Sequence, residues 1–233
     1  MRGAPRVHHR LTDSTNERAR GLAAAGAPHG TLVTADEQTA GRGRQGRSWS
    51  APAGSAVLMS LVLRRHEPSQ AVLPLAAAVA VCEACEELTS VECRIKWPND
   101  VWVAGRKLAG ILVEGRPQEG WAVAGIGLNV STAEADFPPE LRESATSLAI
   151  ESPGAPGVEE VLKALLAALA RRFADAPEAI LEAWRERDVL LGRQVRWAGG
   201  EGTAEGVDDH GSFLVGTEAG SVALDAGEVH LLG

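Results

Sequence analysis

Hydrophobic residues recur along the chain at two different spacings, and the spacing predicts where helices and strands lie. Apolar positions three or four apart predict helices, and short alternating or continuous apolar runs predict strands. Ser14-Thr15-Asn16-Glu17 has the form of a capping box at the start of the first helix, and Gly26 lies where that helix is expected to end. The expected helices span residues 15–25, 68–88, 158–174 and 177–191, and the expected strands span residues 31–36, 56–63, 92–97, 101–103, 109–114 and 121–129.

The order of these elements indicates the fold class. Helices alternate with hairpin-connected strands, which is typical of a sheet with helices packed on one face and not of a helix bundle. From Gly192 onward the chain consists of short β-like pieces separated by Gly and Asp turns, at residues 194–197, 212–216 and 221–223. We therefore expect an α+β fold, a mixed sheet flanked by helices in residues 1–188, followed by a small β-barrel in residues 189–233.

Composition and charge narrow the class of protein. The 233 residues carry a net charge of −8 and a pI of about 5.3, whereas nucleic-acid binders usually have a basic face. Residues 1–10 are basic but are not followed by the apolar stretch of a signal peptide. The longest apolar run, residues 71–82, is short for a membrane span and is interrupted by Pro74. We expect a cytoplasmic protein that binds neither nucleic acid nor a membrane.

Three cysteines raise the question of a metal site. Cys82 and Cys85 have the C-x-x-C spacing, but no second Cys or His pair lies at zinc-finger distance, and Cys93 is the only other cysteine. On a helix Cys82 and Cys85 fall on one apolar face. We expect these cysteines to pack in the core.

Residues 38–49 form the most informative stretch of the sequence. Three arginines alternate with three glycines in Gly41-Arg42-Gly43-Arg44-Gln45-Gly46-Arg47. Glycine lets backbone N–H groups approach an anion, and arginine offers paired donors to phosphate or carboxylate, so the stretch suits a polyanionic small ligand. The same glycines match a dinucleotide fingerprint, but Pro52, Gly54 and a second strand follow where a helix should begin. A solvated loop that only balances the acidic charge is the simpler alternative.

A second polar stretch lies between two predicted strands. A hairpin across Lys96-Trp97-Pro98-Asn99-Asp100 would bring Lys96, Asn99, Asp100 and Lys107 to one end of the sheet. The cations could neutralise a phosphate, and Asp100 could orient an amine or help to hold magnesium. Pro-Asn-Asp is also an ordinary turn signal, so a purely structural turn stays open.

Two further segments have double interpretations. Ser14-Thr15-Asn16 completes a helix cap without any ligand, yet exposed hydroxyl and amide groups at a helix start also suit a small polar head group. Residues 125–130 form a strand whose glycines allow a ligand or a backbone to pass closely. Packing explains those glycines but not Asn129 at the end of the strand.

Together these four segments resemble the catalytic domain of biotin–protein ligases. The matching segments are residues 13–16, 38–49, 96–114 and 125–130, in family order. The resemblance implies a mixed sheet related to class II aminoacyl-tRNA synthetases and lipoate ligases, then an SH3-like barrel that ends near residues 227–231. It implies that biotin reacts with ATP to form biotinyl-5′-adenylate, with Mg²⁺ as cofactor. Biotin then passes to a lysine of the biotin carboxyl carrier protein.

The resemblance also implies roles for individual residues. Ser14, Thr15, Asn16 and Gln38 are expected around the ureido head of biotin, Lys107 at the carboxylate or α-phosphate, and Trp49 on adenine. The implied biotin-binding residues are Ser14, Thr15, Asn16, Gln38, Gly41, Arg42, Gly43, Arg44, Lys107, Gly110 and Gly127. The implied ATP-binding residues are Arg44, Arg47, Trp49, Lys96, Asn99, Asp100 and Asn129, with Arg44 and Lys107 catalytic and Asp100 a candidate magnesium ligand.

Departures from the family pattern and rival functions qualify this hypothesis. Only 13 residues precede Ser14, so we expect no winged helix-turn-helix and no repressor activity, and Gln45 replaces a basic residue of some members. The rivals are a lipoate or octanoate ligase and a non-catalytic biotin-binding module. A homodimer through a sheet edge is open, and we expect the arginine–glycine loop to become ordered on ligand binding.

Overall fold

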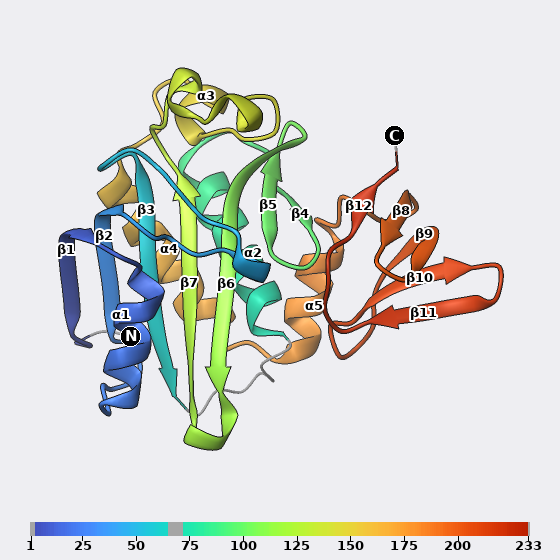
Figure 1. Cartoon of the computed structure of the whole chain (residues 1–233), viewed down its shortest axis with the longest axis horizontal. Coiled ribbons are helices and arrows are strands. Elements are labelled where there is room, and N and C mark those ends of the chain that lie inside the picture. Colours follow the sequence, from blue (N-terminus) through green and yellow to red (C-terminus); the bar gives the residue numbers. More distant parts are fainter. Residues whose placement is uncertain (1–2, 65–71, 233) are drawn as a thin grey trace.

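The structure, a computed structural model, describes residues 3–64 and 72–232. Its larger part is a seven-stranded mixed sheet in the order β1-β2-β3-β7-β6-β5-β4 (Figure 1). The first two strands are parallel because a helix carries the chain between them, and the other neighbouring pairs are antiparallel. The strands are β1 (Arg6–Thr12), β2 (Leu32–Gln38), β3 (Ala56–Arg64), β4 (Arg94–Lys96), β5 (Asp100–Val103), β6 (Arg106–Arg116) and β7 (Trp121–Asn129). The predicted mixed sheet is confirmed.

Strand β1 is an element that the hydrophobic pattern did not predict. It lies at the edge of the sheet and contains few apolar residues, of which Leu11 is 56% exposed. An edge strand buries little side-chain surface, so its sequence shows no clear apolar alternation. The basic segment of residues 1–10 therefore includes part of a strand.

Helices cover both faces of the sheet, so our expectation of helices on one face is wrong. Helix α1 (Thr15–Ala24) packs against Val33, Val62 and Val123 on one face. The opposite face carries α2 (Leu73–Leu88), α4 (Val158–Arg172) and α5 (Pro177–Arg185), which share the large core (Figure 1). Successive residues of a strand face opposite sides, so β3 directs Val62 toward α1 and its neighbours Leu61 and Leu63 toward the large core.

Tertiary contacts set the end of α5 at Arg185 instead of residue 191. The Ile95 N–H donates to the Arg187 carbonyl at 2.7 Å, and the Val189 N–H donates to the Ile95 carbonyl at 3.1 Å. The chain after α5 therefore runs beside the free edge of β4 and satisfies its backbone groups. The predicted start of the second helix near residue 68 lies outside the described residues, and α2 begins at Leu73.

Helix α1 starts and ends where predicted, but the capping box is not formed. Ser14 occupies the N-cap position without a side-chain capping bond, and its own N–H donates to Asp13 Oδ1 at 2.7 Å. Glu17 pairs with Arg20 and Arg42 instead of the N-cap backbone. Gly26 follows the helix with a φ of +90°, as its predicted role requires.

The C-terminal part is a five-stranded antiparallel sheet in the order β11-β10-β9-β8-β12. Sequence analysis missed β9, because its glycines and charged residues interrupt any apolar alternation. The change to this sheet lies between the end of α5 and the start of β8, and the exact boundary at 188/189 stays a prediction. The strands are β8 (Gln194–Trp197), β9 (Gly200–Val207), β10 (Phe213–Thr217), β11 (Gly220–Leu224) and β12 (His230–Leu231).

A tryptophan of the large sheet joins the two parts. The Trp97 ring stacks on Phe213 with centroids 5.3 Å apart and planes inclined by 23°. Trp97 Nε1 also donates to the carbonyl of Gly211 at 3.3 Å. The lysine–asparagine–aspartate stretch is thus held against the C-terminal sheet.

Residues 73–82 of the predicted apolar run lie in α2, whose interior-facing residues are buried. None of the described helices is both long enough and apolar enough to cross a membrane. Cys82, Cys85 and Cys93 are buried free thiols, which confirms their predicted place in the core. Burial raises the pKa of the Cys82 thiol well above its usual value and keeps it neutral.

Candidate active site

The arginine–glycine loop folds back on itself as a small hairpin after β2. The Trp49 N–H donates to the Gly41 carbonyl at 2.9 Å, and the Gly43 N–H donates to the Arg47 carbonyl at 2.7 Å. A 3₁₀ turn at Arg44–Gly46 closes the hairpin. Gly41 has no room for a side chain, because a Cβ atom there would overlap the backbone carbonyl oxygen of Trp49 and lie 2.7 Å from Gln38 Nε2. The glycines therefore allow the loop to lie close to its own strands.

Trp49 lies over two glycines of the sheet. A Cβ atom on Gly127 would be 2.6 Å from Trp49 Nε1, and one on Gly110 would be 3.0 Å from its Cζ3 atom. These two glycines are paired across β6 and β7, so together they leave a flat space for the indole ring. The indole Nε1 is buried against the sheet without a hydrogen-bond partner in the described chain.

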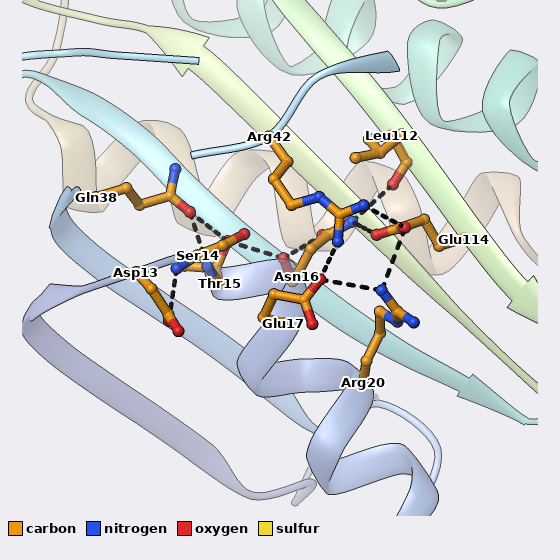
Figure 2. Close-up of polar contacts among 11 residues, drawn as sticks. Asp13, Ser14, Thr15, Asn16, Glu17, Arg20, Gln38, Arg42, Leu112 and Glu114 are labelled. Carbon is orange, nitrogen blue, oxygen red and sulfur yellow. Dashed lines mark hydrogen bonds and ion pairs between the residues drawn. The ribbon is translucent and has the colours of Figure 1, made fainter. Parts of the chain in front are cut away.

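The start of α1 supplies a polar end to the same hollow. Ser14, Thr15 and Asn16 are buried. The Thr15 N–H donates to Gln38 Oε1 at 2.7 Å, which joins the helix start to the end of β2 (Figure 2). The segment that formed no capping box therefore directs its polar groups inward.

Several cations gather around the hollow, and most of them are paired. Arg42 pairs with Glu17 and Glu114, as Figure 2 shows. Arg47 pairs with Glu228 from the C-terminal part, and Lys107 Nζ lies 2.7 Å from Asp100 Oδ1. Each carboxylate neutralises a cation that would otherwise repel its neighbours.

Arg44 and Lys96 are less well compensated. Arg44 is half-buried, and it has no ion-pair partner within the part of the chain that the structure describes. Burial lowers the pKa of Arg44, against an opposing effect of Asp100. Burial also lowers the pKa of Lys96, and Lys107 and Arg47 add to this effect while Asp100 opposes it. A site that desolvates two cations beside further cations is suited to an anionic ligand.

These groups line one cleft, which lies between the arginine–glycine hairpin, the start of α1, the sheet and residues 227–230. Its walls are apolar at Met59, Ile111 and Ile126. The predicted site residues that line it are Ser14, Thr15, Asn16, Gln38, Arg42, Gly43, Arg44, Arg47, Trp49, Lys96, Asn99, Asp100, Lys107, Gly110 and Gly127.

Two predicted residues do not line the cleft. Gly41 lies in the base of the hairpin, where it bonds to Trp49. Asn129 is buried at the end of β7, and its Nδ2 donates to the Thr146 carbonyl at 3.0 Å. Its Oδ1 has no partner in the described chain. Their ligand-binding roles stay predictions.

Sequence analysis also missed residues that hold the site together. Glu17 and Glu114 pair with Arg42, and Ser60 is fully buried beside Thr15 and Asn16. Glu228 reaches Arg47 from the C-terminal part, where residues 227–230 line the cleft. Glu17 and Glu114 lie in segments that the sequence singles out for other reasons, and no local motif marks Ser60 or Glu228. Each of the four becomes relevant to the site only through a partner distant in sequence.

Comparisons with known proteins agree with this geometry. The sequence model of the Biotin/lipoate A/B protein ligase family matches residues 8–131, and that of the Biotin protein ligase C terminal domain matches residues 190–232. The Bifunctional ligase/repressor BirA of Bacillus subtilis is 37% identical over 240 residues, which cover 97% of this chain and 73% of the relative. The Biotin--[acetyl-CoA-carboxylase] ligase of Mycobacterium tuberculosis is 37% identical, with 94% of this chain and 85% of the relative covered.

Solved structures share the fold over the full length. Biotin protein ligase from Aquifex aeolicus, solved in complex with biotin and ATP, matches with a TM-score of 0.85 and 30% identity. The match covers 98% of each chain, so it includes both the seven-stranded sheet and the C-terminal sheet. The sequence motifs, the cleft that they form and these relatives agree, and the chain belongs to the biotin protein ligase family of enzymes.

Proposed function

We propose that this enzyme uses ATP to activate biotin as biotinyl-5′-adenylate and then transfers biotin to a lysine of a biotin carboxyl carrier domain. The observation that carries the proposal is the cleft itself. It has a polar end at Ser14–Asn16, apolar walls, and Arg44, Lys96 and Lys107 at its charged end. The chemical groups of biotin follow the same order, from a polar ureido head through an apolar ring and chain to a carboxylate.

The first step joins two anions, which the cations make feasible. A carboxylate oxygen of biotin attacks the α-phosphorus of ATP, the bond to the bridging oxygen breaks, and pyrophosphate leaves with the electron pair. Lys107 and Arg44 stabilise the charge that develops on the α-phosphate, and Lys96 and Arg47 hold the remaining phosphates. Lys107 pairs with Asp100 in the structure, so it must exchange this carboxylate for the substrate.

The second step needs the mixed anhydride to be kept from water. The uncharged amine of the carrier lysine attacks the acyl carbon, the acyl–phosphate bond breaks, AMP leaves and the amine releases its proton. The arginine–glycine hairpin lies over the cleft and can cover the intermediate. Ordering of this hairpin on binding, stacking of Trp49 on adenine and docking of the carrier remain parts of the proposal.

Magnesium fits the site as a companion of ATP. Magnesium usually takes one or two carboxylates and completes its shell with phosphates and water. Among the described residues no group of three or more His, Cys, Asp or Glu side chains could hold a metal, which argues against an ion held by protein alone. Asp100 lines the cleft and would hold the ion together with phosphate oxygens, and the ion would neutralise phosphate charge.

The proposal also covers the compartment in which the enzyme acts and the molecules that it binds. We infer a cytoplasmic protein whose partners are biotin, ATP and a carrier domain, with a homodimer through a sheet edge still open. The lipoate or octanoate rival is disfavoured by the buried polar end of the cleft, because an alkyl chain or dithiolane ring would leave Thr15 and Asn16 without ligand partners.

The test is transfer of radiolabelled biotin to a purified carrier domain by the full chain with ATP and magnesium. Arg44→Ala and Lys107→Ala should each lower the rate of adenylate formation by about 100-fold, as expected for loss of one charge-stabilising group. Arg10→Ala and Lys163→Ala are matched controls on exposed positions outside the cleft and should retain activity.

Three outcomes would count against the proposal in different ways. Biotin binding without adenylate formation would favour the non-catalytic binding module. Efficient transfer of lipoate in place of biotin would favour the rival ligase. Full activity of both cleft variants would show that the cations have been assigned wrongly.

A further inference from the structure

Three residues form a row across the sheet at the polar end of the cleft. Ser60 of β3 pairs with Gly125 of β7, and Gly125 pairs with Leu112 of β6. Gly125 leaves this row open, since a Cβ atom there would lie 2.7 Å from Asn16 Cγ. The Asn16 side chain therefore lies directly across the row.

The orientation of the Asn16 amide follows from its partners. Its Nδ2 donates to Glu114 Oε2 at 2.9 Å and to the Leu112 carbonyl at 3.4 Å (Figure 2). Both of these atoms only accept hydrogen bonds, so the amide nitrogen must face them. The Oδ1 atom then faces Ser60 Oγ at 2.6 Å.

The hydroxyl of Ser60 contacts the side chains of both Thr15 and Asn16. Ser60 Oγ lies near two oxygens, Asn16 Oδ1 and, at 2.8 Å, Thr15 Oγ1. A hydroxyl carries one hydrogen, and Asn16 Oδ1 can only accept, so Ser60 donates to Asn16. The Thr15 hydroxyl donates its own hydrogen to Gln38 Oε1 at 3.2 Å, and the same oxygen accepts from the Thr15 N–H. The Thr15 oxygen is left with lone pairs that can accept a hydrogen bond from a ligand.

We propose that Ser60 is a positioning residue that holds Thr15 and Asn16 so that the polar end of the cleft accepts hydrogen bonds from ligand N–H groups. Ser60 is fully buried and does not line the cleft, so it acts through Thr15 and Asn16. The inference rests on the proposed function, in which a cyclic urea with two N–H donors binds at this end. Without the Ser60 hydroxyl, Asn16 Oδ1 loses its donor and Thr15 Oγ1 loses the neighbouring hydroxyl that holds it in place, so neither side chain keeps a fixed orientation toward the ligand.

Steady-state kinetics of adenylate formation by the full chain test this role. Ser60→Ala should raise the KM for biotin about 3- to 10-fold, the usual effect of one hydrogen bond. The KM for ATP and kcat should stay unchanged, because the head group is remote from the reacting carboxylate. Ser60→Cys keeps a weak donor of similar size and should give an intermediate KM for biotin.

Ser55→Ala is a matched control. Ser55 is also a buried serine, directly before β3, and its Oγ donates to the Pro52 carbonyl at 2.8 Å outside the cleft lining. This variant should keep the wild-type KM for biotin. Thermal unfolding of every variant separates loss of fold from loss of recognition, and Ser60→Cys carries the test if Ser60→Ala does not fold.

The outcomes distinguish this inference from the proposed function. A wild-type chain that makes no adenylate overturns the proposed function. An active wild type with an unchanged KM for biotin in both Ser60 variants overturns the role of Ser60 alone. A lower kcat together with a raised KM for ATP also overturns it, because these changes indicate general damage to the fold.

Discussion

Substitution of Gly127 by alanine tests whether glycine is needed to seat Trp49. The new Cβ atom would lie 2.6 Å from Trp49 Nε1 and 2.8 Å from its Cδ2 atom. Carbon atoms normally approach to about 3.5 Å, so the rigid indole ring must move by roughly 1 Å. Such overpacking costs about 1–3 kcal/mol in free energy of unfolding. A cost of about 2 kcal/mol lowers the Tm of a chain of this size by about 4–8 °C.

Trp49 lines the cleft, so its displacement should also raise the KM for biotin or ATP. Thermal unfolding and adenylation kinetics measure the two effects separately. Gly21→Ala is the control, because a Cβ atom at this exposed helix position meets no atom within 4 Å. It should stabilise the chain by about 0.5–1 kcal/mol. A Gly127→Ala variant with wild-type Tm and wild-type KM values would refute the assigned packing of Trp49.

Two further predictions concern the joint between the two parts of the chain. Burial raises the pKa of Asp188 to about 6, so the folded state favours the protonated carboxyl. The stability gained from protonation is fully present below about pH 4 and is lost as the pH rises through 6. At pH 8 the free energy of unfolding of Asp188→Asn, measured with urea, should therefore exceed that of the wild type by up to about 3 kcal/mol, whereas below pH 4 it should not. Equal unfolding curves for the two proteins at both pH values would contradict this. Phe213→Leu removes the ring that stacks on Trp97 and should cost about 1–2 kcal/mol in thermal unfolding, whereas Val222→Ala at an exposed position should cost less.

Much of the candidate site could be predicted from the sequence because its chemistry lies in short segments. The arginine–glycine stretch and the lysine–asparagine–aspartate stretch each bring their functional groups together locally. Strand β7 was predictable because its apolar run reflects burial on the sheet, and helix α1 was predictable from the polar segment at its start and from Gly26 at its end. Strand β1 was not, because a largely exposed edge strand has no such pattern.

The sequence by itself determined which small-molecule chemistry the chain can support, the presence of a central mixed sheet, and most of the residues that line the cleft. Only the tertiary structure decided how these residues are held. Strand register places Ser60, Gly125 and Leu112 in one row beneath Asn16, and the C-terminal part brings Glu228 to Arg47. Spacing within a segment sets which side chains share a face, whereas the pairing of distant segments depends on the packing free energy of the whole fold.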